Sequence, residues 1–402
     1  MSRTLLVKFT ETDNLYWSWR WQDTPGEVEA GRLKPEFVAG LRQALAHFLP
    51  EPHGDEDGDA ALKRALTESL LATPDGSLQL GQALGQALFA AEMVEQLRAE
   101  RDRGSRPRLR IQPSPTAARV PWALVRIGPE LEPLISLVNL EFAPPAALTV
   151  SARTPNHRGK TVVAVIDPRV PGAAPTSALG SVLGRPAEND PLAQLLRHGA
   201  LLRPEAENYL GLARRRDLDR AWLREQLADA ARFLYVGHAT SGETADAGAS
   251  AALHLAGAAP HVPVTAAELV RDGWQLPPRC ALIACGSANE LRDLEPMGLT
   301  LAALNCGAEL VTATSWRLPT DAAIAFFGET AADRQPLREL VLAVDTAHEF
   351  DEPVLALADW QRERLRAWEA SGSIADTPLV WAAAVSYARG GRAKQTEKMT
   401  RL

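Results

Sequence analysis

Apolar and amphipathic segments alternate along most of the chain after residue 106, and their order predicts the fold class. The short apolar segments have strand-like composition, and segments with helical periodicity lie between most of them. Strands that alternate with helices favour a mostly parallel α/β sheet with helices on both faces. The predicted strands are 108–112, 161–167, 232–238, 280–285, 308–316 and 379–387, and the predicted helices are 218–231, 265–272, 298–306 and 321–332.

The first hundred or so residues follow a different pattern. After a candidate strand at 4–9, we expect a helix over 33–49 that ends at Pro50, followed by an acidic linker over 51–59. One longer helix is predicted over 78–104 and ends at Gly104, since apolar residues recur there at three- and four-residue steps. This apolar stripe consists of Leu80, Leu84, Leu88, Ala91 and Val94.

Two further segments complete the outline of the chain. The tryptophan-rich residues 16–22, YWSWRWQ, fit a partly buried strand better than a binding face. The proline- and glycine-rich residues 167–190 predict a long surface loop. We therefore expect a smaller α+β N-terminal accessory and regulatory region, mostly helical, over 1–105, a main domain over 106–390 and a flexible tail over 391–402.

Composition and charge exclude several classes of protein. Hydrophobic residues make up 46% of the 402 residues and charged residues 23%, which is typical of globular proteins. A net charge of −7 argues against nucleic acid or an anionic membrane as the main partner. No secretory signal or membrane span is recognisable, and the three cysteines form no metal-type pair, so we expect a reducing, cytoplasmic setting.

Two predicted strands end in residues that could act together as a catalytic pair. His238 ends one strand and Cys285 ends another, and the carboxyl ends of parallel strands form ligand and reaction sites. A cysteine nucleophile needs a base beside it, because the thiolate is its reactive form. Gly286 suits a tight turn that exposes a backbone N–H to a developing oxyanion. The pattern therefore indicates a histidine–cysteine dyad.

Each residue of this pair also has a simpler explanation. Taken alone, Cys285 fits a buried core position and His238 fits a polar residue at a strand end. The two together favour catalysis. We expect no metal or cofactor, because His348 lacks the second histidine of a zinc helix and His254 and His261 have no further ligand at suitable spacing.

On six ordered motifs the chain resembles the CHAT-domain proteins, a family of caspase-like cysteine proteases related to caspases and separases. The resemblance covers about residues 80–390. The motifs are RLRIQPSPTAARVPWALV, VVAVIDPR, YVGHATSG, LIACGSA, the segment from GLTLAALNC to SWRLPTDAAIAFF, and TPLVWAAAVSYARG. The resemblance implies a caspase-like fold and a cytoplasmic endopeptidase of bacterial defence or programmed death.

The resemblance also implies roles for individual residues. The N–H groups of Cys285 and of Ala239, which stands where the family usually has glycine, would hold the oxyanion. Arg317 would line the pocket for the substrate side chain before the scissile bond, together with Ser315, Trp316 and Asp321. A guanidinium there implies cleavage after Asp or Glu. An alternative is that Arg317 only pairs with Asp321 or Glu329.

Regulation and function leave further alternatives open. Residues 286–297 are too short for a caspase-type processing linker, so activity is expected without cleavage there, under control of a partner, a ligand or the N-terminal region. The partner expected at the site is a protein substrate. One alternative is an inactive pseudo-protease that serves as a binding or scaffold module, which Ala239 favours. A small-ligand sensor is disfavoured, because no glycine-rich turn follows the strand at 161–167.

Overall fold

The computed structural model describes residues 3–146, 148, 160–174, 177–240, 247–257, 260–284, 298–328 and 334–389. Cys285, Gly286, Glu329, the segment 286–297 and the tail 391–402 therefore lie outside the described residues. None of the helices in the described ranges is long and apolar enough to cross a membrane.

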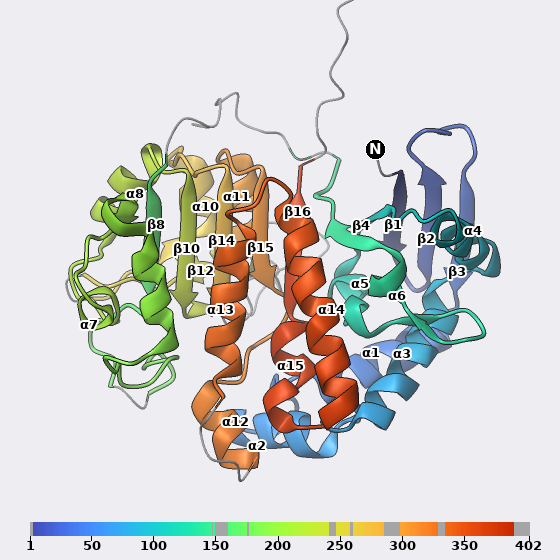
Figure 1. Cartoon of the computed structure of the whole chain (residues 1–402), viewed down its shortest axis with the longest axis horizontal. Coiled ribbons are helices and arrows are strands. Elements are labelled where there is room, and N and C mark those ends of the chain that lie inside the picture. Colours follow the sequence, from blue (N-terminus) through green and yellow to red (C-terminus); the bar gives the residue numbers. More distant parts are fainter. Residues whose placement is uncertain are drawn as a thin grey trace, which may run out of the picture.

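One large mixed sheet organises the fold, as the alternation of strands and helices predicts (Figure 1). Its strands, from one edge to the other, are β3 (Glu29–Leu33), β2 (Leu15–Trp21), β1 (Thr4–Glu11), β4 (Arg108–Gln112), β7 (Asn139–Phe142), β16 (Ala384–Ala388), β15 (Leu310–Thr314), β14 (Arg279–Ala284), β10 (Arg232–Gly237), β8 (Val162–Ile166) and β9 (Leu202–Arg203).

The strands of this sheet run in two directions. β9, β8, β10, β14 and β15 are parallel to one another, and β16 pairs antiparallel with β15. β7, β4 and β1 then follow the direction of β16. The carboxyl ends of β8, β10, β14 and β15 therefore share one edge, where ligand sites form in parallel sheets.

Helices cover both faces of this sheet (Figure 1). α8 (Arg220–Ala228), α10 (Ala266–Arg271) and α11 (Leu299–Asn305) connect successive parallel strands and lie on one face, and α13 (Pro336–Ala347) and α14 (Pro353–Ser371) cross the other. The other α-helices are α1 (Pro35–Phe48), α2 (Gly58–Lys63), α3 (Pro74–Leu88), α4 (Ala91–Asp102), α5 (Pro115–Ala118), α6 (Leu134–Leu137), α7 (Tyr209–Leu212), α9 (Ala247–Ser250), α12 (Asp321–Gly328) and α15 (Pro378–Trp381).

Short elements complete the chain. Two-residue strands form a three-stranded sheet of β11 (Ala239–Thr240), β12 (Ala252–Leu253) and β13 (Val264–Thr265), and a pair of β5 (Arg126–Ile127) and β6 (Glu132–Pro133). The remaining helical turns are η1 (Arg64–Glu68), η2 (Leu70–Ala72), η3 (Trp122–Leu124), η4 (Pro191–Leu201) and η6 (Ile374–Asp376). In the described parts of 167–190 no helix or strand is present, which confirms the predicted loop, but it does not lie wholly on the surface, because Asp167, Val182 and Leu183 are buried.

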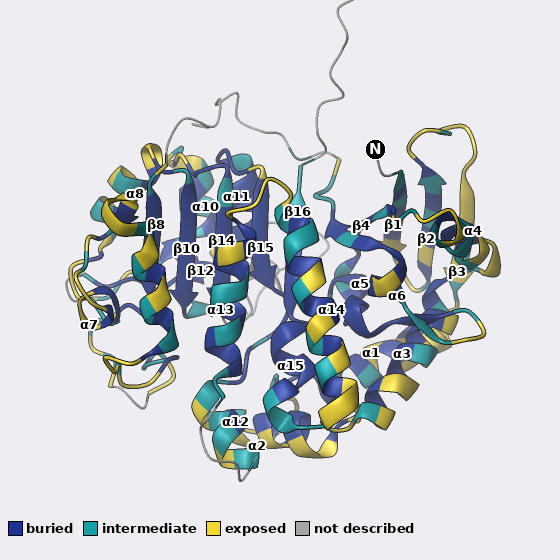
Figure 2. Cartoon of the chain, viewed as in Figure 1, coloured by how far each residue is buried: buried dark blue, intermediate teal, exposed yellow. Residues whose placement is uncertain are grey.

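The first strands belong to the same sheet as the rest of the chain. β1 pairs in parallel with β4, from Thr4 opposite Arg108 to Lys8 opposite Gln112. Trp17, Trp19 and Trp21 of β2 are buried in the common core, as the alternating pattern of 16–22 predicts. Figure 2 shows the buried residues continuing across the sheet from β8 to β1.

The single helix predicted over 78–104 is wrong, because the structure divides it into α3 and α4. Phe89 and Ala90 between them have extended backbones. Phe89 is buried there and packs edge-on against Trp122, with ring centroids 6.2 Å apart. The extended step lets Phe89 reach the core, and α4 then buries Met93, Leu97 and Glu100, while Ala91 of the predicted stripe is exposed. Gly104 ends the segment with φ +72°.

The strand predicted over 379–387 is wrong in its first half. Residues 378–381 form α15, and the strand β16 begins only at Ala384. Thr377 caps the helix by accepting a hydrogen bond from the N–H of Leu379, and Pro378 occupies its first turn, where proline is favoured. This cap outweighs the strand-like composition of Leu379, Val380 and Trp381.

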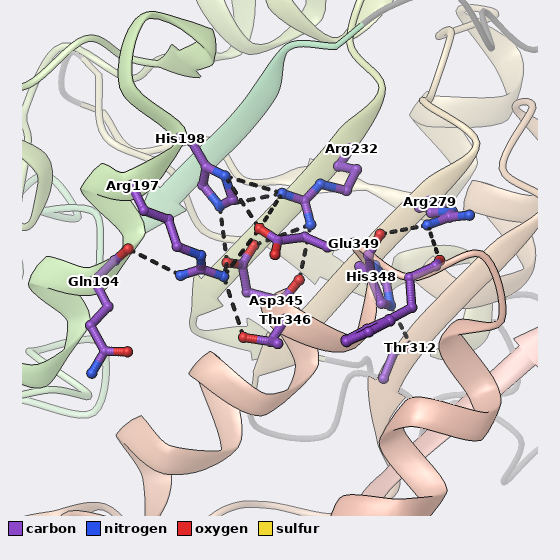
Figure 3. Close-up of polar contacts among 11 residues, drawn as sticks. Gln194, Arg197, His198, Arg232, Arg279, Thr312, Asp345, Thr346, His348 and Glu349 are labelled. Carbon is purple, nitrogen blue, oxygen red and sulfur yellow. Dashed lines mark hydrogen bonds and ion pairs between the residues drawn. The ribbon is translucent and has the colours of Figure 1, made fainter.

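The carboxyl end of α13 lies against the first residues of β10 and β14 (Figure 3). Arg232 donates to the carbonyl of Asp345 at 2.9 Å, and Arg279 donates to the carbonyls of His348 at 2.6 Å and Phe350 at 2.7 Å. The last carbonyls of a helix lack partners within the helix, and cations stabilise that end. The two arginines therefore fix α13 to the sheet.

His348, directly after α13, is fully buried in this cluster. Its Nε2 lies 2.8 Å from the hydroxyl of Thr312 on β15, which in turn lies 3.0 Å from the hydroxyl of Ser386 on β16. Burial, together with the charge of Arg232, lowers the pKa of His348 to about 3. The native state therefore holds this imidazole neutral, whereas the unfolded chain protonates it below about pH 6.5.

We expect His348 to make the protein less stable as the pH falls. Its contribution is complete above about pH 6.5 and is lost progressively toward pH 3, because only the unfolded state binds the proton in that window. Replacing His348 by Gln, which can still bond to Thr312, should make the dependence of the unfolding free energy on pH shallower by up to about 1.4 kcal/mol per pH unit. Urea unfolding between pH 7 and 4 measures this difference, and parallel curves for the two proteins would contradict it.

Candidate functional site

The candidate site begins where two neighbouring parallel strands end in register. β10 pairs with β14 along its whole length, and the last pair is Gly237 opposite Ala284. His238 and Cys285 are the next residues in the chain. Cys285 lies outside the described residues, but the hydroxyl of Thr314 on β15 donates to the carbonyl of Ala284 just before it. The expected adjacency of the two strands is therefore present.

The imidazole of His238 is held by a backbone carbonyl of the loop after β8. Its Nε2 lies 2.9 Å from the carbonyl oxygen of Gly180. Since a carbonyl can only accept, Nε2 carries the proton and the neutral ring keeps the lone pair on Nδ1. In this tautomer Nδ1 can take a proton from a nucleophile.

The surroundings of His238 favour its neutral form. Burial lowers its pKa below the usual value, and the nearby charges of Arg317 and Arg214 lower it further. The hydrogen bond to Gly180 and the charge of Asp167 act in the opposite direction without cancelling the effect of burial. At neutral pH His238 is therefore suited to act as a base.

The backbone around His238 is fixed from the other side. Its carbonyl accepts a hydrogen bond from the N–H of His254 at 3.1 Å and lies 2.7 Å from the hydroxyl of Tyr235. Ala239 follows in β11, where it pairs with Leu253 of β12. Ala239 does not have a positive φ, so its methyl group creates no backbone strain where the family usually has glycine.

Arg317 follows β15 on the same edge of the sheet and lies close enough to His238 to affect its pKa. Its guanidinium is half-buried and contacts the N-terminal region, since a methyl group built on Gly58 would lie 3.0 Å from Nη1 of Arg317. Gly58 is the first residue of α2, and α2 and α12 lie close together at the bottom of Figure 1. Residues 259 positions apart in the sequence (317 − 58) thus meet at this edge.

Asp321 does not pair with Arg317, which was one alternative for the arginine. Its carboxylate accepts a hydrogen bond from Arg338 at 2.6 Å and another from the N–H of Leu337 at 2.7 Å. No carboxylate within the described ranges forms an ion pair with Arg317, and Glu329, the other alternative, lies outside them. Arg317 therefore presents a guanidinium without a described acidic partner.

The two residues before Arg317 are buried. Trp316 is 1% exposed, and its indole N–H donates to the carbonyl of Leu379 at 2.8 Å. The side chain of Ser315 is also buried, and its hydroxyl has no hydrogen-bond partner among the residues described. Trp316 thus anchors the segment to the core.

The described cysteines and the pair of His254 and His261 lie in surroundings that favour a structural role over a catalytic one. Cys280 and Cys306 are buried, and burial raises the pKa of Cys280, which makes its thiol unreactive. His254 and His261 stack and are joined by a 2.9 Å contact between Nδ1 and Nε2. Burial and the neighbouring histidines lower the pKa of His254 to about 4.

One described group, His198, Asp345 and Glu349, has the geometry to hold a metal ion (Figure 3). Its ligand atoms lie within 4.8 Å of one another. Arg197 and Arg232 already pair with both carboxylates, at 2.5 Å and 3.7 Å to Asp345 and 3.3 Å and 3.6 Å to Glu349. A cation would have to displace both guanidinium groups, so the residues fit an ion-pair network better than a metal centre.

Several residues of the site were missed in the sequence, Gly180 beside His238 among them. Asp167 follows an apolar strand, and a carboxylate at that position was an available signal. Gly58 gave none, because only the fold brings it beside Arg317. Arg338 lies within a helix and links three segments: its guanidinium donates to Asp190 at 2.9 Å, to Asp321, and to the carbonyl of Leu183 at 2.6 Å.

Comparison with known proteins gives one family match and two distant structural similarities. The model of the CHAT domain family matches residues 78–389, which is more than three quarters of the chain. Two crystal structures of the Saccharomyces cerevisiae separase–securin complex are similar to this chain at 12% and 13% identity, with TM-scores of 0.47 and 0.48. Each comparison covers 96% of this chain and 30% of the matched chain, and no curated protein matches.

The family match, the order of the strands and the edge at which His238 lies agree with one another. The described residues form a mostly parallel sheet with helices on both faces, and the family match covers most of it. The chain belongs to the CHAT domain family.

Proposed function

We propose that the protein is a caspase-like cysteine endopeptidase that uses Cys285 as nucleophile and His238 as general base. The observation that carries this proposal is the end of the β10–β14 ladder at Gly237 and Ala284, directly before these two residues. Neighbouring strands are about 4.8 Å apart, so side chains that follow such a pair are within reach of each other. The lone pair on the unprotonated Nδ1 of His238 supports the same role.

The reaction then proceeds through an acyl-enzyme. Nδ1 of His238 accepts the thiol proton of Cys285, and the thiolate sulfur attacks the scissile carbonyl carbon. The N–H groups of Cys285 and Ala239, with Gly286 shaping the turn, stabilise the oxyanion. The imidazolium gives its proton to the departing amine, and a water molecule activated by His238 hydrolyses the thioester.

Arg317 supports cleavage after an acidic residue. A guanidinium with no described carboxylate partner, on the same edge as His238, can bind the carboxylate of Asp or Glu with two hydrogen bonds. We assign the hydroxyl of Ser315 as a further donor for that carboxylate, since it has no partner among the described residues. Asp321 contributes indirectly, because its pair with Arg338 fixes the start of α12 after Arg317.

The biological setting belongs to the same proposal. We place the enzyme in the cytoplasm of a bacterial defence or programmed-death system, acting on a protein substrate under the control of a partner, a ligand or the N-terminal region. The contact of Gly58 with Arg317 supports a role for that region, since it covers part of the guanidinium.

An inactive binding module is the second candidate. The alanine at position 239 suggested it, because alanine adopts fewer backbone conformations than glycine. Its φ is not positive, and its place in β11 is an ordinary strand position, so alanine is compatible with an N–H donor at this site. This observation favours the active enzyme.

Labelling of Cys285 separates the two candidates. An electrophilic peptide with Asp next to the reactive group should modify Cys285, and His238→Ala should slow the modification by about 100-fold or more, since the base is lost. Mass spectrometry of the labelled peptide measures the rate, with Cys285→Ala as the control. An equal rate in His238→Ala, or labelling of Cys280 or Cys306 instead, would support the inactive module.

Selectivity for an acidic residue should depend on Arg317 and on the space beside Gly58. Arg317→Gln should lower kcat/KM for an Asp-containing peptide by about 10- to 100-fold and leave an uncharged analogue less affected, because charge-assisted bonds are lost. Gly58→Asp should also lower this kcat/KM, since the new carboxylate would pair with the guanidinium of Arg317 in place of the substrate.

Gly58→Asn is the matched control, because it adds the same bulk without the charge. We expect it to be about 10-fold more active than Gly58→Asp on the acidic peptide. Equal activities would show that bulk alone matters, and faster cleavage after Arg than after Asp would contradict the assignment of Arg317.

The chain should be active without cleavage between residues 286 and 297. The segment is too short to serve as a processing linker, so activity should appear while the chain is intact. Gel analysis during an activity assay, with the activator supplied by cell extract if needed, measures this. An active form that consists of two chains cut in this segment would contradict it.

A further inference from the structure

Asp167, the first residue after β8, combines burial with an unusual backbone. It is 1% exposed and has a φ of +47°. A non-glycine residue in the left-handed region costs on the order of 1 kcal/mol and persists only where its surroundings hold it. The N–H of Asp167 donates to the carbonyl of Val236 on β10 at 2.7 Å, which ties it to the strand that ends at His238.

The carboxylate of Asp167 organises the loop that follows Gly180. It accepts hydrogen bonds from the hydroxyl of Ser181 and from the N–H groups of Val182 at 3.1 Å and Leu183 at 3.4 Å. These residues come directly after Gly180, whose carbonyl accepts the Nε2–H of His238. One carboxylate thus fixes the turn that presents the carbonyl to the imidazole.

Arg214 is the second charged residue at this point, and it also has a positive φ, of +56°. Its N–H donates to the carbonyl of Ile166 at 3.1 Å. Its guanidinium lies 3.3 Å from the carboxylate of Asp167 and 3.4 Å from the carbonyl oxygen of Gly180. Arg214 and His238 therefore share one acceptor, and Asp167 balances the charge of the arginine.

We propose that Asp167 is a positioning residue for His238, acting through Ser181, Gly180 and Arg214 rather than by direct contact. It keeps the Gly180 carbonyl directed at Nε2 of His238, so the ring stays in the tautomer whose Nδ1 carries no proton. The inference rests on the proposed function, in which His238 is the base. Asp167 contacts no reacting atom, and its effect on turnover is indirect.

Because Asp167 and Arg214 carry opposite charges, replacing them should shift the pKa of His238 in opposite directions. A purely structural role would not produce this pattern. Within the described ranges, the charged groups that act on His238 are Asp167, Arg214 and Arg317, with His254 as a further titratable neighbour. Removing the negative charge should make His238 harder to protonate, and removing the positive charge of Arg214 should make it easier. A general loosening of the fold would move both variants in the same direction.

The test is an NMR titration of the histidine ring signals in the full-length protein, with His238 assigned from the loss of its signal in His238→Gln. In Asp167→Asn we expect the pKa of His238 to fall by about 0.5 or more, and in Arg214→Gln to rise. Asp217→Asn is the matched control, because it removes a carboxylate paired with Arg215 on the exposed surface and should leave His238 unchanged. An unchanged His238 in Asp167→Asn, or shifts of the same sign in both charge variants, would overturn the proposal.

The tautomer gives a second readout that requires no turnover. Nitrogen chemical shifts should show the proton on Nε2 in the wild type and a mixture of both tautomers in Ser181→Ala, which removes the hydroxyl that contacts Asp167 and the carbonyl of Gly184 without changing charge. If Asp167→Asn does not fold, Ser181→Ala and Arg214→Gln still decide the question. If the shifts occur but the wild type cuts no peptide, the positioning stands and the protease assignment fails.

Discussion

The parallel ladder between β10 and β14 is the constraint on which the candidate site depends. Its hydrogen bonds continue to Gly237 and Ala284, so both strands reach the same edge of the sheet without an offset. A slip of one residue in either strand would turn every following side chain to the other face. Arg232 and Arg279 begin the two strands opposite each other and also bind the end of α13, which fixes this register from the other side.

α13 runs between the carboxyl ends and the amino ends of the parallel strands. At its amino end, Arg338 joins Asp190, Asp321 and the loop at Leu183, close to the groups around His238. At its carboxyl end, its carbonyls accept from the arginines that start β10 and β14. Buried ion pairs of this kind contribute little net stability, but the loss of one partner would leave an uncompensated buried charge, so the elements that they join stay together. We regard α13 as the element that keeps the loop and the strands in one geometry.

Much of this architecture was predictable from local patterns. The alternation after residue 106 predicts the parallel strands, and the positions of His238 and Cys285 at strand ends indicate the edge that matters. The step at Phe89 was not predictable, because its cause is a contact with Trp122 that only the folded chain contains. The helix at 378–381 was missed for a different reason, since its apolar residues match a strand equally well and only the cap at Thr377 decides between them.

The residues of the candidate site also divide into those that the sequence predicts and those that it does not. The strand-end residues could be found from the sequence, because a side chain at the end of a parallel strand has a defined place. Gly180 and Gly58 could not be found, since each contributes only a backbone position, one in a loop and one at the start of α2, and offers no side chain to identify it. Asp321 was expected beside Arg317, but in the folded chain its carboxylate accepts a hydrogen bond from Arg338 instead.

The parallel pairing of β1 with β4 has a practical consequence for dissecting the protein. The family match begins at residue 78, whereas β1, β2 and β3 precede it and complete the sheet beside β4. A fragment trimmed to the matched residues would turn β4 from an interior strand into an edge, with a row of unsatisfied N–H and C=O groups. Such edges recruit strands from other molecules. Self-association of that fragment would therefore reflect where it was cut and not a natural oligomer.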